Sequence, residues 1–264
     1  MAKFRMNHQR SGRGGSGMIA KIGVLSFLLF ATVFGFLQFS STELPWWMPE
    51  PTKAEERFFL PSANGKQTVI HRPYYSLALK ENGASPCWAA YELRADRFGK
   101  PAKGQAAGEG DWVQAPLALP GDLGFARLSK KDTEIPENQV WQRTGNFQQM
   151  WSVLARQLRR WSIEEGMLYQ TSGPWWKQNT GAVRPDRPDG YFRVAVDLNG
   201  PDFRGIGFLL ENEGPIESLG NRVVSIDSIE NLTGIDFFAE LMLDSLEALI
   251  EGEYCPEDWT WSEQ

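Results

Sequence analysis

The longest apolar run of the chain lies near its start. Residues 22–39 (IGVLSFLLFATVFGFLQF) carry no charge over 18 positions, which is close to the minimum length of a bilayer-spanning helix. The 21 residues before it hold five basic side chains and no acidic one, which favours a cytoplasmic N-terminus. A cleaved signal peptide is the alternative, although its apolar region is usually shorter. We expect a basic tail at 1–21, a transmembrane anchor at 22–39 and the remainder in the periplasm or outside the cell.

Short apolar or alternating stretches after the anchor predict strands. They are residues 68–71, 74–79, 87–93, 168–171, 191–198 and 205–210. Residues 99–121 are rich in Gly, Ala and Pro, which is typical of an irregular loop. Residues 40–57 carry several prolines and predict a linker, and the absence of a second such segment predicts one domain over 58–264.

A helical spacing of apolar residues is clearest over 147–161. Its stripe consists of Met150, Trp151, Leu154, Leu158 and Trp161. Two shorter helices are predicted at 225–232 and 236–250, with Ser225 and Asp236 as N-caps. Together the patterns predict an α+β domain with a mainly antiparallel central sheet.

Composition limits the classes of fold and of site. The 11 Trp indicate large buried aromatic anchors, and the two Cys exclude a disulfide-dense scaffold or a multi-Cys zinc domain. If the domain lies in an oxidising compartment, one disulfide between Cys87 and Cys255 is the expectation. Two unrelated buried thiols are the alternative, with equal weight.

The net charge of −6 combines three different regions. The first 40 residues are basic, residues 41–210 are nearly neutral with 21 basic and 19 acidic groups, and residues 211–264 hold 14 acids against Arg222 alone. An acidic chain is a poor generic nucleic-acid binder, but here the acids lie at the C-terminal end. Such an excess is typical of a solvated face, and the alternative is a docking surface for a basic protein partner.

Several segments, in this order, resemble the DNA/RNA non-specific endonuclease family, the sugar-nonspecific ββα-metal nucleases that include mitochondrial endonuclease G. They are HRPYYSLAL (71–79), WAAYEL (88–93), NFQQMWSVL (146–154), YQTSGP (169–174), YFRVAVDL (191–198), GFLLEN (207–212) and SIDSIENLTGIDFF (225–238). The resemblance implies a ββα-metal nuclease-like fold that hydrolyses phosphodiesters. A neutral His would take a proton from water, and a hydrated Mg²⁺ would stabilise the developing charge.

The family's catalytic His belongs to a D-R-G-H motif, and the matching stretch here is GDLGFAR (121–127). Asp122 and Gly124 match this motif, but Phe125 stands at the position of the His. Because a phenyl ring accepts no proton, the resemblance implies that the catalytic base is missing.

The family's metal ligand is the Asn of a helical pattern like F-N-x-G-x-W-x-x-L-E. With Trp151 in register, Phe147 stands at this Asn and Ala155 at the supporting Glu. Asn146 is the neighbouring residue and stays a candidate metal ligand, although a neighbour on a helix is rotated by about 100°. Mg²⁺ is therefore expected only if activity is retained.

The remaining candidates are few. The chain has two His, and His8 precedes the anchor while His71 begins a strand, where a structural or surface role is favoured over catalysis. Arg127 and Arg156 are candidate nucleic-acid contacts.

Three hypotheses follow for function. The first is a membrane-anchored pseudo-nuclease that serves binding or assembly without phosphodiesterase activity. The second is an active metal-dependent DNA/RNA endonuclease with a site rebuilt around Asp122 and Asn146. The third is a scaffold that binds a protein partner through the acidic C-terminal face.

Overall fold

In the computed structural model the chain forms two units, residues 1–50 and 51–264. The residues that the structure describes are 48–63, 65–80, 86–100, 108–177, 187–252 and 255–261. The predicted basic tail at 1–21 and the predicted anchor at 22–39 lie outside them. Among the described residues, no helix has the length and apolar character needed to cross a membrane.

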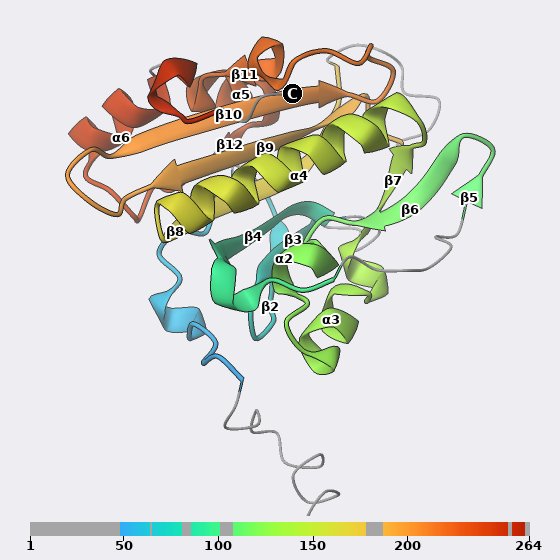
Figure 1. Cartoon of the computed structure of the whole chain (residues 1–264), viewed down its shortest axis with the longest axis horizontal. Coiled ribbons are helices and arrows are strands. Elements are labelled where there is room, and N and C mark those ends of the chain that lie inside the picture. Colours follow the sequence, from blue (N-terminus) through green and yellow to red (C-terminus); the bar gives the residue numbers. More distant parts are fainter. Residues whose placement is uncertain are drawn as a thin grey trace, which may run out of the picture. The chain divides into compact units, whose positions relative to one another are not determined.

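The main sheet has seven strands in the order β11-β10-β9-β8-β4-β3-β2, and every neighbouring pair is antiparallel (Figure 1). Its strands are β2 (Gln67–His71), β3 (Ser76–Lys80), β4 (Pro86–Arg94), β8 (Met167–Trp175), β9 (Gly190–Asp197), β10 (Arg204–Glu211) and β11 (Val223–Val224). The α+β class and the antiparallel sheet predicted from the sequence are thus confirmed. All six predicted strands belong to this sheet.

Two smaller sheets were not expected. A three-stranded sheet joins β5 (Gly108–Glu109), β6 (Trp112–Pro116) and β7 (Gln139–Arg143), and β1 (Ser62–Ala63) pairs with β12 (Ile235–Asp236). The prediction of an irregular loop over 99–121 is therefore wrong at 112–116. This segment obtains its hydrogen bonds from β7, a partner that the local Gly- and Pro-rich composition does not reveal.

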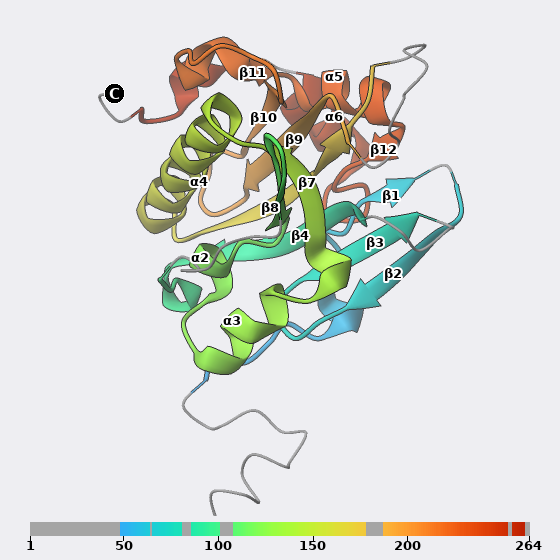
Figure 2. The ribbon, with the colours of Figure 1, turned by 90° about the vertical axis from the view of Figure 1, so that its right-hand side faces the viewer.

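The predicted long helix is confirmed as α4 (Asn146–Glu164). It follows Gly145, whose φ of 76° turns the chain into the helix from a conformation that favours glycine. The five residues of the predicted stripe are all buried. Figure 2 shows α4 on one side of the main sheet, with α5 (Ile226–Thr233) and α6 (Asp244–Gly252) on the other.

The C-terminal helices agree with the prediction only in part. The Ser225 side chain accepts a hydrogen bond from the Ser228 backbone N–H and caps α5, as predicted. The prediction of Asp236 as an N-cap is wrong, because Asp236 belongs to β12 and α6 begins at Asp244. Phe238 has a φ of 62° and a fully buried ring, so tertiary packing holds the backbone there outside the helical region.

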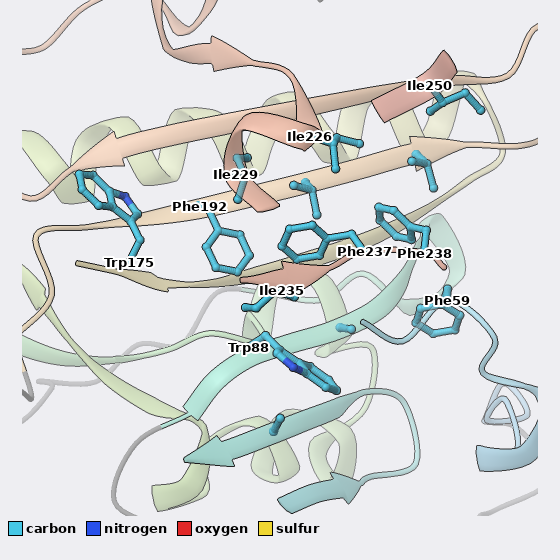
Figure 3. Close-up of a cluster of buried hydrophobic side chains, with 14 residues drawn as sticks. Phe59, Trp88, Trp175, Phe192, Ile226, Ile229, Ile235, Phe237, Phe238 and Ile250 are labelled. Atoms are coloured by element: carbon cyan, nitrogen blue, oxygen red, sulfur yellow. The ribbon is translucent and has the colours of Figure 1, made fainter. Parts of the chain in front are cut away.

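A hydrophobic core fills the space between the main sheet and the α5–α6 pair (Figure 3). Its members include Trp88 on β4, Phe192 on β9, Ile226 and Ile229 on α5, and Ile250 on α6. Two glycines of β10 allow the helices to come close to the sheet. A Cβ on Gly205 would lie 2.7 Å from Ile250 Cγ2, and one on Gly207 would lie 2.8 Å from Ile229 Cδ1.

The remaining helices are short. They are α2 (Pro120–Leu123), α3 (Arg127–Thr133), and the 3₁₀ turns η1 (Ala54–Glu56), η2 (Ala95–Arg97), η3 (Pro136–Asn138), η4 (Leu219–Arg222) and η5 (Pro256–Asp258). After η1, the buried Arg57 donates to the carbonyls of Arg72, Pro73 and Tyr75. Residues 51–57, which the sequence places in the linker, are thus fastened to the domain.

Candidate functional site

The candidate site is centred on Asp122 of α2, a residue that the sequence analysis singled out. Its side chain is fully buried. Oδ1 accepts a hydrogen bond from Arg159 Nε at 2.5 Å, and Oδ2 accepts from Arg193 Nη2 at 2.9 Å and from the Tyr91 hydroxyl at 2.6 Å. One carboxylate is therefore enclosed by two guanidinium groups and a phenol.

The main sheet positions two of these partners. Tyr91 on β4 stands opposite Gln170 on β8, and Arg193 on β9 stands opposite Ser172, two residues further along β8. Since side chains two residues apart share one face of a strand, Tyr91, Gln170 and Arg193 lie on the same face of the sheet. Arg159 reaches Asp122 from α4, which covers that face.

Arg193 is fully buried and is held by several groups. Its Nε donates to Gln170 Oε1 at 2.7 Å, and its guanidinium lies over the Trp151 ring at 5.7 Å. Burial raises the pKa of Tyr91 far above its ordinary value, so this phenol remains a hydrogen-bond donor at neutral pH.

Three buried donors beside this network have no hydrogen-bond partner among the described residues. They are Arg193 Nη1, Gln170 Nε2 and Trp151 Nε1. A buried donor without an acceptor is costly, so each of these groups calls for a water or a ligand atom.

A pocket of about 350 Å³ lies between α2 and α4. Its apolar wall comes from the β6–α2 segment and from one face of α4, and Ser152, Arg156 and Arg159 add polar groups. The full lining is Pro116, Leu119, Pro120, Gly121, Trp151, Ser152, Ala155, Arg156 and Arg159. Gly121 gives room to the Arg159 guanidinium, because a Cβ on this glycine would lie 2.5 Å from Arg159 Nη2.

The three residues predicted to stand at catalytic positions are packed apolar side chains. Phe125 stacks edge-on against Tyr74 with ring centroids 5.0 Å apart. Phe147 is buried, with its ring 5.8 Å from Trp151 and 5.3 Å from Tyr191. Ala155 is buried and contributes its methyl group to the pocket wall.

Gly124 keeps a structural purpose. A Cβ on Gly99 would lie 2.5 Å from the Gly124 Cα. A Cβ on Gly124 would lie 2.1 Å from the Pro120 carbonyl oxygen. Gly99 is thus required by its close approach to the Gly124 backbone, and Gly124 by the carbonyl oxygen of Pro120 at the start of α2. Asn146 is the first residue of α4, but its side chain lies outside what the structure describes.

The residues around Asp122 do not fit a hydrated Mg²⁺. This ion binds through open carboxylate oxygens and keeps several of its waters. Both oxygens of Asp122 already accept hydrogen bonds, two of them from cationic groups that would repel a metal ion. The residues around Asp122 therefore give no support to a metal-assisted step at this site.

The two predicted nucleic-acid contacts are not brought together in one site. Arg156 is exposed and lines the pocket, whereas Arg127 is exposed at the start of α3 and is not part of the lining. His71 is exposed on β2, with Nδ1 3.0 Å from Ser76 Oγ, a contact that belongs to the β2–β3 pair.

The predicted disulfide is not formed. Cys87, near the start of β4, and Cys255, which precedes η5, are both described and are not joined. Cys87 instead lines a separate pocket beside Lys80 and Trp176, and burial raises the pKa of its thiol. The two cysteines thus belong to different surroundings.

Sequence reasoning missed Tyr91 and Arg193 as partners of Asp122. A signal for Arg193 exists in the stretch YFRVAV (191–196), where one charged residue interrupts an otherwise apolar run. A charge inside such a strand indicates a buried counter-charge.

Scans of known protein families and of curated proteins both find no match to this chain.

Proposed function

We propose that residues 58–264 form a nuclease-like domain that binds a ligand without cleaving phosphodiesters, held outside the cytoplasm by the anchor at 22–39. One observation carries this proposal. The positions that correspond to the base, the metal ligand and the supporting acid hold packed Phe125, Phe147 and Ala155. An aromatic ring or a methyl group supplies neither a proton acceptor nor a metal ligand.

The surroundings of Asp122 support the loss of hydrolysis. Arg159 and Arg193 use this carboxylate as a counter-charge, so it is not available to a metal ion. A rebuilt site around Asp122 would first have to give up both ion pairs. The active-endonuclease hypothesis therefore has less support than the binding hypothesis.

The pocket between α2 and α4 supports a binding role. It combines Arg156 and Arg159 with the Trp151 ring, whose buried Nε1 has no hydrogen-bond partner among the described residues. Arginine and an aromatic face suit a ligand that carries negative charge or a planar ring. Nucleic acid is the first such ligand to test, because both features occur in it.

The test of hydrolysis uses the full chain in detergent, incubated with plasmid DNA and with RNA in Mg²⁺ or Mn²⁺. We expect no cleavage by the natural protein or by Phe125→His, because the other two catalytic positions remain Phe147 and Ala155. Cleavage that co-elutes with the protein and disappears on heating it would overturn the proposal.

The test of binding uses the fluorescence anisotropy of a labelled single-stranded oligonucleotide. Arg156→Ala should weaken binding by about threefold to tenfold, a typical effect for one exposed phosphate contact. Arg160→Ala is the matched control, because this exposed arginine on the same helix pairs with Glu164 and does not line the pocket. Equal effects of both substitutions would assign binding to general charge.

Cell fractionation tests the predicted membrane anchor separately. We expect the full chain in the membrane fraction, released by detergent but not by high salt, since an apolar helix is not held by charge. Protease added to intact cells after opening of any outer membrane should reach the domain. A soluble chain, or a protected domain, would contradict this part of the proposal.

A further inference from the structure

Four carboxylates of the acidic C-terminal region gather between α5 and α6. Asp227 and Glu230 are three residues apart on α5, and Glu247 and Glu251 are four residues apart on α6. These spacings place each pair on one face of its helix. Carboxylate oxygens of Asp227, Glu230 and Glu251 all lie within 4.8 Å of one another.

Two of these acids have a local explanation in the fold. Asp227 lies in the first turn of α5, where a negative charge is favourable. Glu230 accepts a hydrogen bond from the Phe237 backbone N–H at 2.7 Å, which fixes the chain after α5.

Glu251 has no such explanation. It is 3% exposed, and its Oε1 is buried with no hydrogen-bond partner among the described residues. Glu247 Oε1 is likewise buried and without a partner in the described part of the chain. A buried carboxylate oxygen that accepts no hydrogen bond costs free energy. A cation bound to Glu251 would remove this cost.

The backbone at the C-terminus of α6 adds to the negative potential at this acidic cluster. A Cβ on Gly252 would lie 3.3 Å from Asp227 Oδ2, so this carboxylate rests against the last turn of α6. The C-terminus of a helix presents carbonyl oxygens without intrahelical partners and the negative end of the helix dipole. None of the four carboxylates forms an ion pair with a described Lys, Arg or His.

The burial and crowding of these carboxylates raise the pKa of Glu230 and of Glu251. Burial, followed by the neighbouring acids, raises the pKa of Glu251 to about 9. Burial also raises the pKa of Glu230 to about 7. In the absence of a cation, the cluster would therefore bind protons to reduce its charge.

We propose that Asp227, Glu230 and Glu251 bind a divalent cation of the Ca²⁺ or Mg²⁺ type between α5 and α6, with Glu247 as an adjacent acid. Hard divalent cations prefer carboxylate and carbonyl oxygens, which are the donors present here. A Zn²⁺ site would normally include Cys or His, and neither residue type belongs to the cluster.

The cation would add a second link between two helices that already contact each other and share the surface of β10. α5 packs against Gly207 through Ile229, and Ile226 of α5 and Ile250 of α6 both pack against Gly205. A metal ion shared by both helices would neutralise the buried charge and join the C-terminal helix to the rest of the domain. Metal binding would thus stabilise the fold by mass action.

The experiment uses the full chain in detergent, treated with EDTA and then desalted. Ca²⁺, Mg²⁺ and Mn²⁺ are titrated separately by calorimetry, and the thermal midpoint is followed at each concentration. We expect one ion per chain and a midpoint that rises with the concentration of the preferred cation. No binding heat and no midpoint shift up to about 10 mM of each ion, a concentration well above extracellular calcium-module affinities, would overturn the proposal.

Two variants identify the site. Glu251→Gln keeps the shape of the side chain and should lower the affinity at least about tenfold, since even groups that only support metal ligands contribute this much. Asp227→Asn, at a partly exposed position, provides a second ligand variant that should fold normally. In EDTA, Glu251→Gln should melt no lower than the natural protein.

The matched control is Glu240→Gln, which removes the same charge from an exposed position in the same acidic region. It should leave affinity and stoichiometry unchanged. Equal losses in Glu240→Gln and Glu251→Gln, or several ions bound per chain with no dependence on Glu251, would reveal general attraction to an acidic surface and overturn the site.

Discussion

At the scale of single residues, Asp122 holds together parts of the chain that are distant in sequence. Its three partners, Tyr91, Arg159 and Arg193, come from β4, α4 and β9. Arg193 is as fully buried as Asp122, so its positive charge depends on this carboxylate. Asp122 therefore has a structural purpose that is sufficient to explain its presence.

We expect Asp122→Ala to lower the free energy of unfolding by about 3–5 kcal/mol, the usual cost of leaving a buried charge without its partner. Urea denaturation followed by tryptophan fluorescence measures this loss. Asp202→Ala is the control, because Asp202 is exposed, and it should change stability by less than about 0.5 kcal/mol. Similar midpoints for both variants would show that the buried ion pairs contribute little.

Part of the candidate site could be predicted from the sequence. The order of residues along the chain was sufficient to single out Asp122 and Ala155, which lie in the polar network and in the pocket wall. The partners of Asp122 could not be identified in this way. Their proximity arises from strand pairing between β4, β8 and β9, which local patterns do not specify.

At the scale of elements, β10 determines how closely the C-terminal helices approach the main sheet. Gly205 faces both α5 and α6, Gly207 faces α5, and neither glycine has room for a methyl group. At Gly207 one of the obstructing atoms is the Val224 carbonyl oxygen, a backbone atom 2.8 Å from the position of a Cβ. The close contact therefore cannot be relieved by rotating a side chain.

We expect Gly207→Ala to destabilise the domain by about 1–3 kcal/mol, as overpacking of a core does. The loss should appear as a lower thermal midpoint. Gly220→Ala serves as the matched control, because a Cβ there would meet only Ser218 Oγ at 3.7 Å. A Gly207→Ala variant as stable as the control would mean that β11 and α5 shift outward without cost.

The elements also show why sequence patterns succeed or fail. α4 was predicted accurately because it is long and its apolar stripe is regular. The start of α6 was not predicted accurately. The apolar residues just after Gly234 belong to β12 and to the buried rings of Phe237 and Phe238, not to the helix. Those contacts come from the sheet and the helices around them, and they override local helix preference.

At the scale of the whole domain, the main sheet is assembled from two parts of the chain. β2, β3 and β4 are consecutive, and so are β8, β9, β10 and β11. The two parts meet where β4 pairs with β8, for example with Ala89 opposite Ser172. Between them the chain forms the three-stranded sheet, α2, α3 and α4.

We expect a chain that ends at Glu165 to remain unfolded, because it contains α4 and β4 but lacks β8, their shared neighbour. Circular dichroism and limited proteolysis measure the outcome. A chain that ends at Trp261 is the control and should fold, because all strands and the Trp161–Trp261 ring contact are retained. A protease-resistant fragment ending at Glu165 would contradict the expectation.

The pairing of β4 with β8 has a consequence for the order of events during synthesis. The hairpins of β2, β3 and β4 are made early, and the edge of β4 that pairs with β8 stays uncovered until the 72 residues between Arg94 and Met167 have followed. An open strand edge attracts other chains, and pairing between distant segments is slow. If the domain crosses a membrane as an extended chain, it reaches the far side with that edge uncovered. We therefore expect its yield in the cell to depend on chaperones that shield β4 until β8 arrives.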